Sequence, residues 1–297
     1  MVARGAASGL TDDPAGALER LAQATGVSFP HLSAARHRTA EHFARREREF
    51  DALVLDADAS VVLMGSWGRR ELTQGSDDDW IVLLEGHERS DPHPTLDEVK
   101  RIVGDEAKPG VEGVFGTYVY SEDLAGRIGL DRDDNRNLTR RMLLLLESLP
   151  VAGEDAYRRA WGQVLDGYLL DPSVRDRWPP RFLLNDTVRY WRTICVDFVG
   201  KERQRGGGGW GLRNAKLRTS RKLLFASGFL PILACRERAK EDMGPFLLRQ
   251  FSARPPIASR LRSSSTKRPM PERGPCTPTT ASSGSSTTPP LARRSRP

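Results

Sequence analysis

Residues 60–84 read SVVLMGSWGRRELTQGSDDDWIVLL, and this stretch decides the fold. Its two ends, Ser60–Met64 and Trp80–Leu84, are short apolar runs, which are typical of buried strands. Gly65 ends the first run, and a Ser-Asp-Asp-Asp sequence at 76–79 leads into the second. We therefore expect two neighbouring strands, with glycine and carboxylates at the strand ends.

The surrounding sequence alternates between helical and strand patterns. Apolar residues at helical spacing predict a helix near residues 18–22 and a longer one from Ser33 to about Leu55. After the second strand, residues 95–106 carry an apolar helical face, and residues 114–120 read as a third strand. The expected fold class is α/β (α+β), with a small mixed sheet and flanking helices.

The second half of the chain reads as helical. From Asp133 onward we expect no further strand, and helix-like patterns cover residues 138–149, 154–170, 182–202 and 212–227. Four glycines at 206–209 break the last two helices apart. Basic side chains gather around this break, between Arg203 and Lys222.

The composition changes after about residue 253. The last 45 residues are rich in Ser, Thr, Pro and Arg and poor in apolar residues, so we expect disorder. Because helical patterning stops abruptly after Phe251, we also consider that a frameshift in the gene created this tail. The expected organisation is a helical extension (1–29), an α/β domain (30–130), a helical domain (131–252) and the tail (253–297).

The bulk properties favour a globular protein of the cytoplasm. Hydrophobic residues make up 38% and charged residues 29% of the chain. Cys195, Cys235 and Cys276 match no CxxC spacing, so no disulfide framework or zinc site is expected. Residues 1–29 lack an export signal, and the longest apolar run, 142–146, is too short to cross a bilayer. A net charge of +7 is typical of proteins with anionic partners, but the sign of the charge changes along the chain, so its position matters more than its total.

The polar residues between the two predicted strands suit phosphate and metal chemistry. Asp77 and Asp79 stand at alternate positions before a strand and therefore project from one face, whereas Asp78 points to the other. Two carboxylates on one face suit Mg²⁺ or Mn²⁺. The Gly65-Ser66 turn, read as the start of a short helix, would let backbone amides approach a phosphate.

Arginines follow that turn. Arg69 and Arg70 could make bidentate contacts with phosphate oxygens. A solvent-facing ion pair with Glu71 or Asp78 is an equal alternative. In the same way, the basic segment 203–222 reads either as a solvated helix face or as a substrate surface.

The wider pattern resembles a known superfamily. A strand, Gly65-Ser66, a short helix and Asp77-x-Asp79 at a strand start are similar to the signature of the DNA polymerase beta nucleotidyltransferases. The string Gly65-Ser66-x-Gly68-Arg69-x-Glu71-Leu72, followed by Ser76-Asp77-x-Asp79, is nearest to PII-protein uridylyltransferases, glutamine-synthetase adenylyltransferases and related nucleotidyltransferases. The resemblance covers residues 60–84 well and the rest only in outline.

The resemblance implies an enzyme that transfers a nucleoside monophosphate from an NTP, such as ATP, to a protein, small-molecule or RNA acceptor. Gly65, Ser66 and Arg69 would bind the nucleotide, and Asp77 and Asp79 would hold Mg²⁺ or Mn²⁺. The family has a third carboxylate on a later strand. Glu112 is the residue chosen here for that role, with Glu122 and Asp123 as alternatives.

Two other functions stay open. The first is a non-catalytic nucleotide-binding regulatory module, because the run from Val114 to Tyr120 contains no acid. The second is a toxin-like nucleotidyltransferase that acts on tRNA, which rests on the basic charge of residues 201–222.

Overall fold

The computed structural model describes most of the chain between residues 14 and 252. The described ranges are 14–69, 71–73, 76–87, 95–103, 113–131, 133–204, 206 and 208–252. The predicted tail at 253–297 and residues 1–13 of the predicted N-terminal extension fall outside them. All described residues belong to one compact unit.

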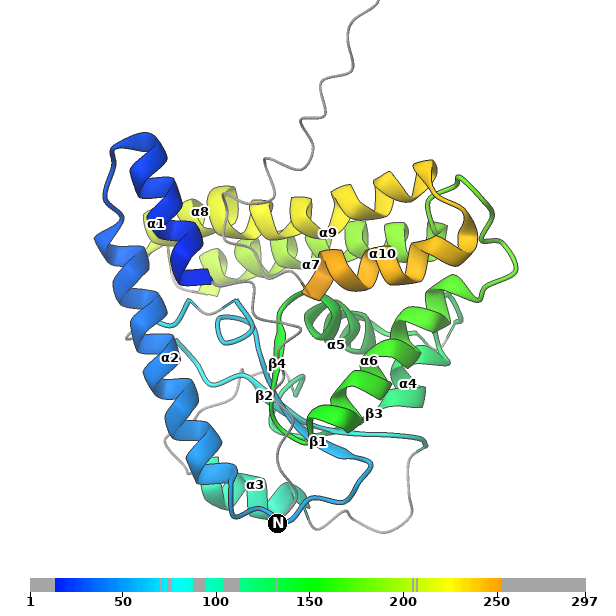
Figure 1. The fold of residues 1–297 in the computed structure, drawn as a ribbon, viewed down its shortest axis with the longest axis horizontal. Helices are drawn as coiled ribbons and strands as arrows, with labels where there is room; N and C mark the ends of the chain where they lie inside the picture. Colours follow the sequence, from blue (N-terminus) through cyan, green and yellow to red (C-terminus); the bar gives the residue numbers. More distant parts are fainter. Residues whose placement is uncertain are drawn as a thin grey trace, which may run out of the picture. The chain divides into compact units, whose positions relative to one another are not determined.

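The protein is a mixed α/β fold with mostly helical content and a four-stranded mixed sheet (Figure 1). In chain order its elements are α1 (Pro14–Thr25), α2 (Pro30–Phe50), β1 (Ala59–Met64), β2 (Trp80–Leu84), α3 (Thr95–Val103), β3 (Tyr118–Tyr120), α4 (Ser121–Ala125), α5 (Asn135–Leu146), β4 (Ser148–Ala152), α6 (Glu154–Leu169), α7 (Arg181–Gln204), α8 (Trp210–Lys216), the π-helical turn η1 (Leu217–Arg221), α9 (Lys222–Ala234), the 3-10 turn η2 (Cys235–Glu237) and α10 (Lys240–Ser252). The two strands predicted first, β1 and β2, are confirmed.

The sheet has the strand order β3-β2-β1-β4. Strand β1 pairs antiparallel with both β2 and β4, and β2 pairs parallel with β3. Every residue of β1 and β2 is buried, because both faces of the sheet are covered by helices. This two-sided burial explains why both strands are continuous apolar runs.

Alternate strand residues enter two different cores. Val62, Met64 and Ile81 join the larger core, which α5, α6, α7, α9 and α10 complete. Val61, Leu63 and Val82 join a smaller core with residues of α2 and α3. Figure 1 shows α2 to the left of the strands and α5 and α6 to their right.

Strand β4 is the main difference from expectation. The prediction of no strand after Asp133 is wrong, and so is the helix predicted to reach residue 149, because α5 ends at Leu146 and β4 follows at once. Pro150 cannot donate a backbone hydrogen bond, which hides a strand from sequence inspection, but an edge strand tolerates it. The border predicted between residues 130 and 131 therefore falls within the segment that builds the sheet.

Smaller differences concern element ends. Strand β3 covers only Tyr118–Tyr120, shorter than the predicted 114–120. The predicted helix at 212–227 belongs to a longer run of α8, η1 and α9. Among the described residues, no helix combines the length and the apolar character that crossing a membrane requires.

Candidate active site

One end of each of the four strands meets at the same side of the sheet, which we call the Gly65 edge. Strand β1 ends at this edge, while β2, β3 and β4 all begin there, as their pairing registers require. The residues that follow Met64 and those that precede Trp80, Tyr118 and Ser148 therefore lie close together. This edge holds the Gly65 turn, the acidic run at 77–79 and Glu147.

Gly65 and Asp79 lie next to each other at this edge. The Met64 amide donates to the Asp79 carbonyl (2.8 Å), which extends the pairing of β1 and β2 by one residue. Gly65 has a φ of +65°, and a Cβ atom built on it would lie 3.1 Å from Oδ2 of Asp79. A glycine is therefore favoured twice, by the left-handed backbone and by the carboxylate against it.

The turn after Gly65 is fixed onto the start of β4. The Gly65 amide donates to the Glu147 carbonyl at 2.9 Å. A Cβ on Gly68 would lie 2.0 Å from the carbonyl carbon and oxygen of Glu147, so the two backbones touch. The predicted short helix is wrong for residues 65–69, which form hydrogen-bonded turns, because the backbone is left-handed at Gly65 and held against β4 at Gly68.

Ser66 and Asp77 are the groups of the edge with unused hydrogen-bonding capacity. Ser66 is half-buried, and neither its amide nor its hydroxyl has a hydrogen-bond partner within the described residues. Asp77 is exposed and has no polar partner in that same part of the chain. Donors and acceptors left in this way can serve a ligand.

Asp78 has a structural role on the opposite face. Its carboxylate accepts a hydrogen bond from Arg46 of α2 (2.6 Å) and another from the Trp67 indole (2.9 Å). The alternation expected for residues 77–79 is consistent with this contact. The charge of Asp78 is thus neutralised by Arg46 of α2.

Arg69 does not reach the edge as an unpaired cation. Its guanidinium pairs with Glu71 (3.1 Å) and with Glu147, and only 13% of the side chain is exposed. Burial, and then the charge of Arg221, lower the pKa of Arg69 below its ordinary value. The ion pair with Glu71 is present, but it is largely buried and not solvent-facing as expected. The phosphate role of Arg69 stays a prediction. Arg70 lies outside the described residues.

Glu147 is the functional candidate that sequence reasoning missed. Its carboxylate is fully buried, accepts a hydrogen bond from the Tyr190 hydroxyl (3.0 Å), and lies 3.5 Å from the Arg221 guanidinium. Burial raises the pKa of Tyr190, Arg221 and Arg69 lower it, and the charge of Asp79 raises it further. Tyr190 of α7 is therefore linked to Glu147 by a hydrogen bond and to Asp79 through the effect of its charge. The available signal was Pro150, which predicts that a helix ends near Glu147.

The third carboxylate is not identified at this edge. Glu112 lies outside the described residues. Glu122 and Asp123 follow β3 at the opposite edge, where Glu122 pairs with His87 (2.7 Å) and Asp123 with Arg127. In the described ranges, no group of three or more His, Cys, Asp or Glu side chains is arranged to hold a metal. Asp77, Asp79 and the Ser66 hydroxyl are the oxygen donors present, of the kind that Mg²⁺ prefers.

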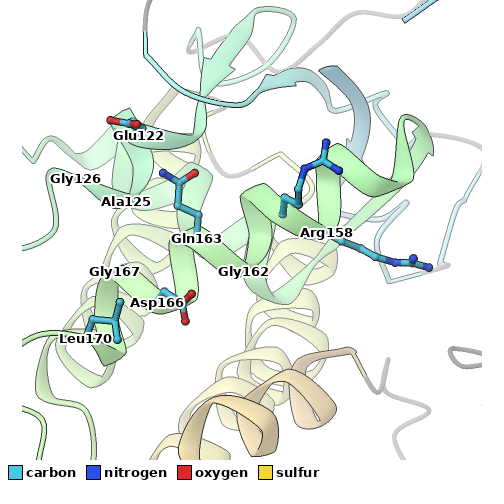
Figure 2. Close-up of a pocket in the computed structure, with 10 residues that line it drawn as sticks. Glu122, Ala125, Gly126, Arg158, Gly162, Gln163, Asp166, Gly167 and Leu170 are labelled. Atoms are coloured by element: carbon cyan, nitrogen blue, oxygen red, sulfur yellow. The ribbon is translucent and has the colours of Figure 1, made fainter. Parts of the chain in front are cut away.

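A separate hollow lies between α4 and α6, with a volume of about 580 Å³ (Figure 2). Its lining includes Glu122, Arg158 and Arg159. Arg159 pairs with Glu85, which follows β2, so the hollow lies at the opposite edge of the sheet from Gly65. Of its charged groups, Glu122 lies 2.7 Å from His87 and Arg158 pairs with Glu154 (2.6 Å), whereas Asp166 has no ion-pair partner in the described part of the chain. Because the motif at residues 60–84 lies at the other end of the strands, we place the candidate chemistry at the Gly65 edge.

Comparison with known proteins gives no relative. No protein-family model, curated protein or solved structure matches this chain. The assignment of a function therefore depends on the geometry of the Gly65 edge and on the sequence resemblance of residues 60–84.

Proposed function

We propose that the protein is a metal-dependent nucleotidyltransferase with a polymerase-beta-like core. The observation that carries this proposal is that the Asp79 carboxylate occupies the space beside Gly65 where a Cβ would lie, at the meeting point of β1 and β2. A surface turn has no need of a glycine that makes room for a carboxylate. A site that brings a phosphate and a metal together needs this arrangement.

We assign different roles to the residues of the Gly65 edge. Asp77 and Asp79 would hold Mg²⁺ or Mn²⁺, which when bound neutralises charge on the triphosphate. The Ser66 amide and hydroxyl would donate to phosphate oxygens. The acceptor hydroxyl forms a bond to the α-phosphorus, its proton passes to a carboxylate, and the bond to the leaving pyrophosphate breaks. Glu112 remains the residue predicted to take the proton.

The test is transfer of label from α-labelled NTPs, with Mg²⁺ or Mn²⁺, to a panel of protein, small-molecule and RNA acceptors. We expect Asp77→Asn and Asp79→Asn each to lower transfer by about a hundredfold or more, the size of effect seen when a group that stabilises transition-state charge is removed. Asp155→Asn is the matched control, because its side chain is 85% exposed and lies on α6. Equal transfer by the wild type and both site variants would contradict the proposal.

The second candidate is a nucleotide-binding regulatory module without turnover. It is favoured by one observation: among the described residues, no three His, Cys, Asp or Glu side chains are arranged to hold a metal. Binding of a fluorescent NTP that Asp79→Asn weakens, together with no transfer to any acceptor, would select this candidate over the enzyme.

A further inference from the structure

The helix that runs from α8 through η1 into α9 carries a cationic face beside the candidate active site. We propose that this face binds single-stranded RNA, so that an RNA end is the acceptor of the reaction proposed above. The sequence from Arg203 to Arg236 contains no acidic residue and eight basic ones, namely Arg203, Arg205, Arg213, Lys216, Arg218, Arg221, Lys222 and Arg236.

The charges of this face are exposed and not neutralised. Lys216, Arg218 and Lys222 are exposed, and none of them has an ion-pair partner in the described part of the chain. Arg218 and Lys222 are four residues apart on one continuous helical run, so they lie on the same side. The exposed Lys201 differs, because it pairs with Asp197 at 2.9 Å. An unneutralised row of cations is what a polyanion requires.

The cationic face is continuous with the candidate active site. Arg221 is adjacent to Lys222 in the chain, and its guanidinium lies 3.5 Å from the Glu147 carboxylate. The backbone carbonyl of that same Glu147 accepts the hydrogen bond from the Gly65 amide. A strand lying along Arg218 and Lys222 would therefore end close to Gly65 and Asp79.

The charge and an exposed aromatic residue favour RNA over a protein acceptor. Phosphates of a single strand repeat along its backbone and match a row of cations, whereas a protein acceptor would have to present a folded acidic surface. Trp210, the first residue of α8, is 46% exposed and offers a ring on which a base can stack. RNA ends are commonly recognised as unpaired strands through such contacts.

The experiment measures binding of a fluorescent single-stranded oligoribonucleotide to the full chain by anisotropy, over a range of salt concentrations and without NTP or metal. We expect binding that weakens with salt. The double variant Arg218→Gln, Lys222→Gln should bind about tenfold or more weakly and lower the steepness of the salt dependence by about 1.4, or roughly 0.7 for each lost phosphate contact. Trp210→Ala should weaken binding and leave the salt dependence unchanged.

The matched control is Arg136→Gln, Arg175→Gln, which removes the same charge from exposed positions on other elements and should bind like the wild type. Circular dichroism of each variant verifies folding, and Lys216→Gln provides a further variant of the face. The proposal is overturned if RNA does not bind, if the Arg218 and Lys222 variant binds like the wild type, or if single-stranded DNA binds more tightly than RNA. RNA binding with transfer only to another acceptor would overturn RNA as the acceptor, whereas RNA binding with no transfer to any acceptor would reject the proposed function instead.

Discussion

Two buried charges, Arg141 in the middle of α5 and Glu147 directly after its end, make a useful comparison. Arg141 is a fully buried cation held by two carboxylates and a tyrosine, and Glu147 is a fully buried anion held by two guanidinium groups and a tyrosine. The arrangements are close to mirror images in charge. They differ in how far the partners of the central charge are buried and paired. We infer that the fully buried centre is structural and that the partly exposed one borders a site.

The Arg141 centre is closed. Its guanidinium donates to Asp133 (2.6 and 2.8 Å), to Asp186 (2.9 Å) and to the Tyr168 hydroxyl (2.9 Å), and both carboxylates are themselves buried. Burial alone would lower the pKa of Arg141, but the hydrogen bond to Asp133 and the charges around it raise the pKa above its ordinary value. This centre joins α5 to α6 and α7 and leaves no group for a ligand.

The Glu147 centre is open on one side. Arg221 approaches Glu147 only to 3.5 Å, and 35% of its side chain is exposed. The same centre touches the Gly65 turn through the Glu147 backbone. Arg221 is partly exposed and lies near the turn in which the Ser66 amide and hydroxyl have no partner among the described residues. This arrangement suits a site that binds an anionic substrate, whereas the Arg141 centre suits stability alone.

The largest effect is expected from Arg141→Met. This change removes the buried cation and leaves the two buried carboxylates only the partly exposed Arg189, which lies 3.0 Å from Asp186 and 3.8 Å from Asp133. The loss of one partner of a buried ion pair costs about 3–5 kcal/mol in the free energy of unfolding. Urea denaturation followed by circular dichroism measures the loss. Arg158→Met, which removes an exposed pair with Glu154, should cost less than about 1 kcal/mol. A loss of similar size for both variants would end the distinction between buried and exposed pairs here.

The next effect is expected from Gly68→Ala. A Cβ at Gly68 would lie 2.0 Å from the Glu147 carbonyl, and because the obstacle is backbone, the turn must move away from β4 at a cost of about 1–3 kcal/mol or more. Gly162→Ala in α6 is the control, since its Cβ meets nothing within 4 Å and alanine should stabilise that helix by about 0.4–1 kcal/mol. Thermal melting of both variants should show shifts of opposite sign.

Glu147→Gln should cost less than the loss of Arg141, about 1–2 kcal/mol. The reason is that Arg69 retains Glu71 and the partly exposed Arg221 can be solvated, so neither cation is stranded. Chemical denaturation measures the cost, and nucleotidyl transfer of the same variant measures its effect on the site. A loss as large as that of Arg141→Met would mean that the Glu147 centre is as closed as its counterpart.

The smallest difference is expected between Gly65→Ala and Gly26→Ala. Both glycines have almost the same φ, +65° and +66°, so each alanine pays a backbone cost of about 1–2 kcal/mol. Only at Gly65 does the new Cβ meet a neighbour, Oδ2 of Asp79 at 3.1 Å. The two variants should unfold within about 1 kcal/mol of each other, while only Gly65→Ala lowers transfer in the assay. Equal activity would remove the link between the Gly65 turn and Asp79.

The sequence predicts the elements whose burial is uniform. Strands β1 and β2 are buried on both faces, and their apolar runs make them visible without knowledge of their partners. Strand β4 is half-buried from Pro150 onward and follows α5 directly, so local pattern alone assigns its first residues to the helix. Its strand conformation depends on pairing with β1, which is a contact between distant parts of the chain.

The residues of the candidate site also fall into those that the local sequence predicts and those that depend on contacts between distant parts of the chain. Gly65, Asp77 and Asp79 follow from strand ends, because the alternation of side chains is a local property. Glu147 looks like an ordinary acid at a helix end until β4 brings it beside Arg69 and Tyr190. The role of Asp78 depends similarly on Arg46, thirty-two residues away, which reaches it from α2.

Strand β4 also has a consequence for how copies of the protein behave toward one another. Strand β4 is an edge strand of the described sheet, and its pairing with β1 is irregular between Val61 and Val62. Pro150 lacks a backbone N–H, so it removes one hydrogen-bond donor from this strand. The other edge, β3, is only three residues long. A strand from another molecule would find few regularly spaced groups to pair with at either edge, so the sheet resists extension into intermolecular aggregates.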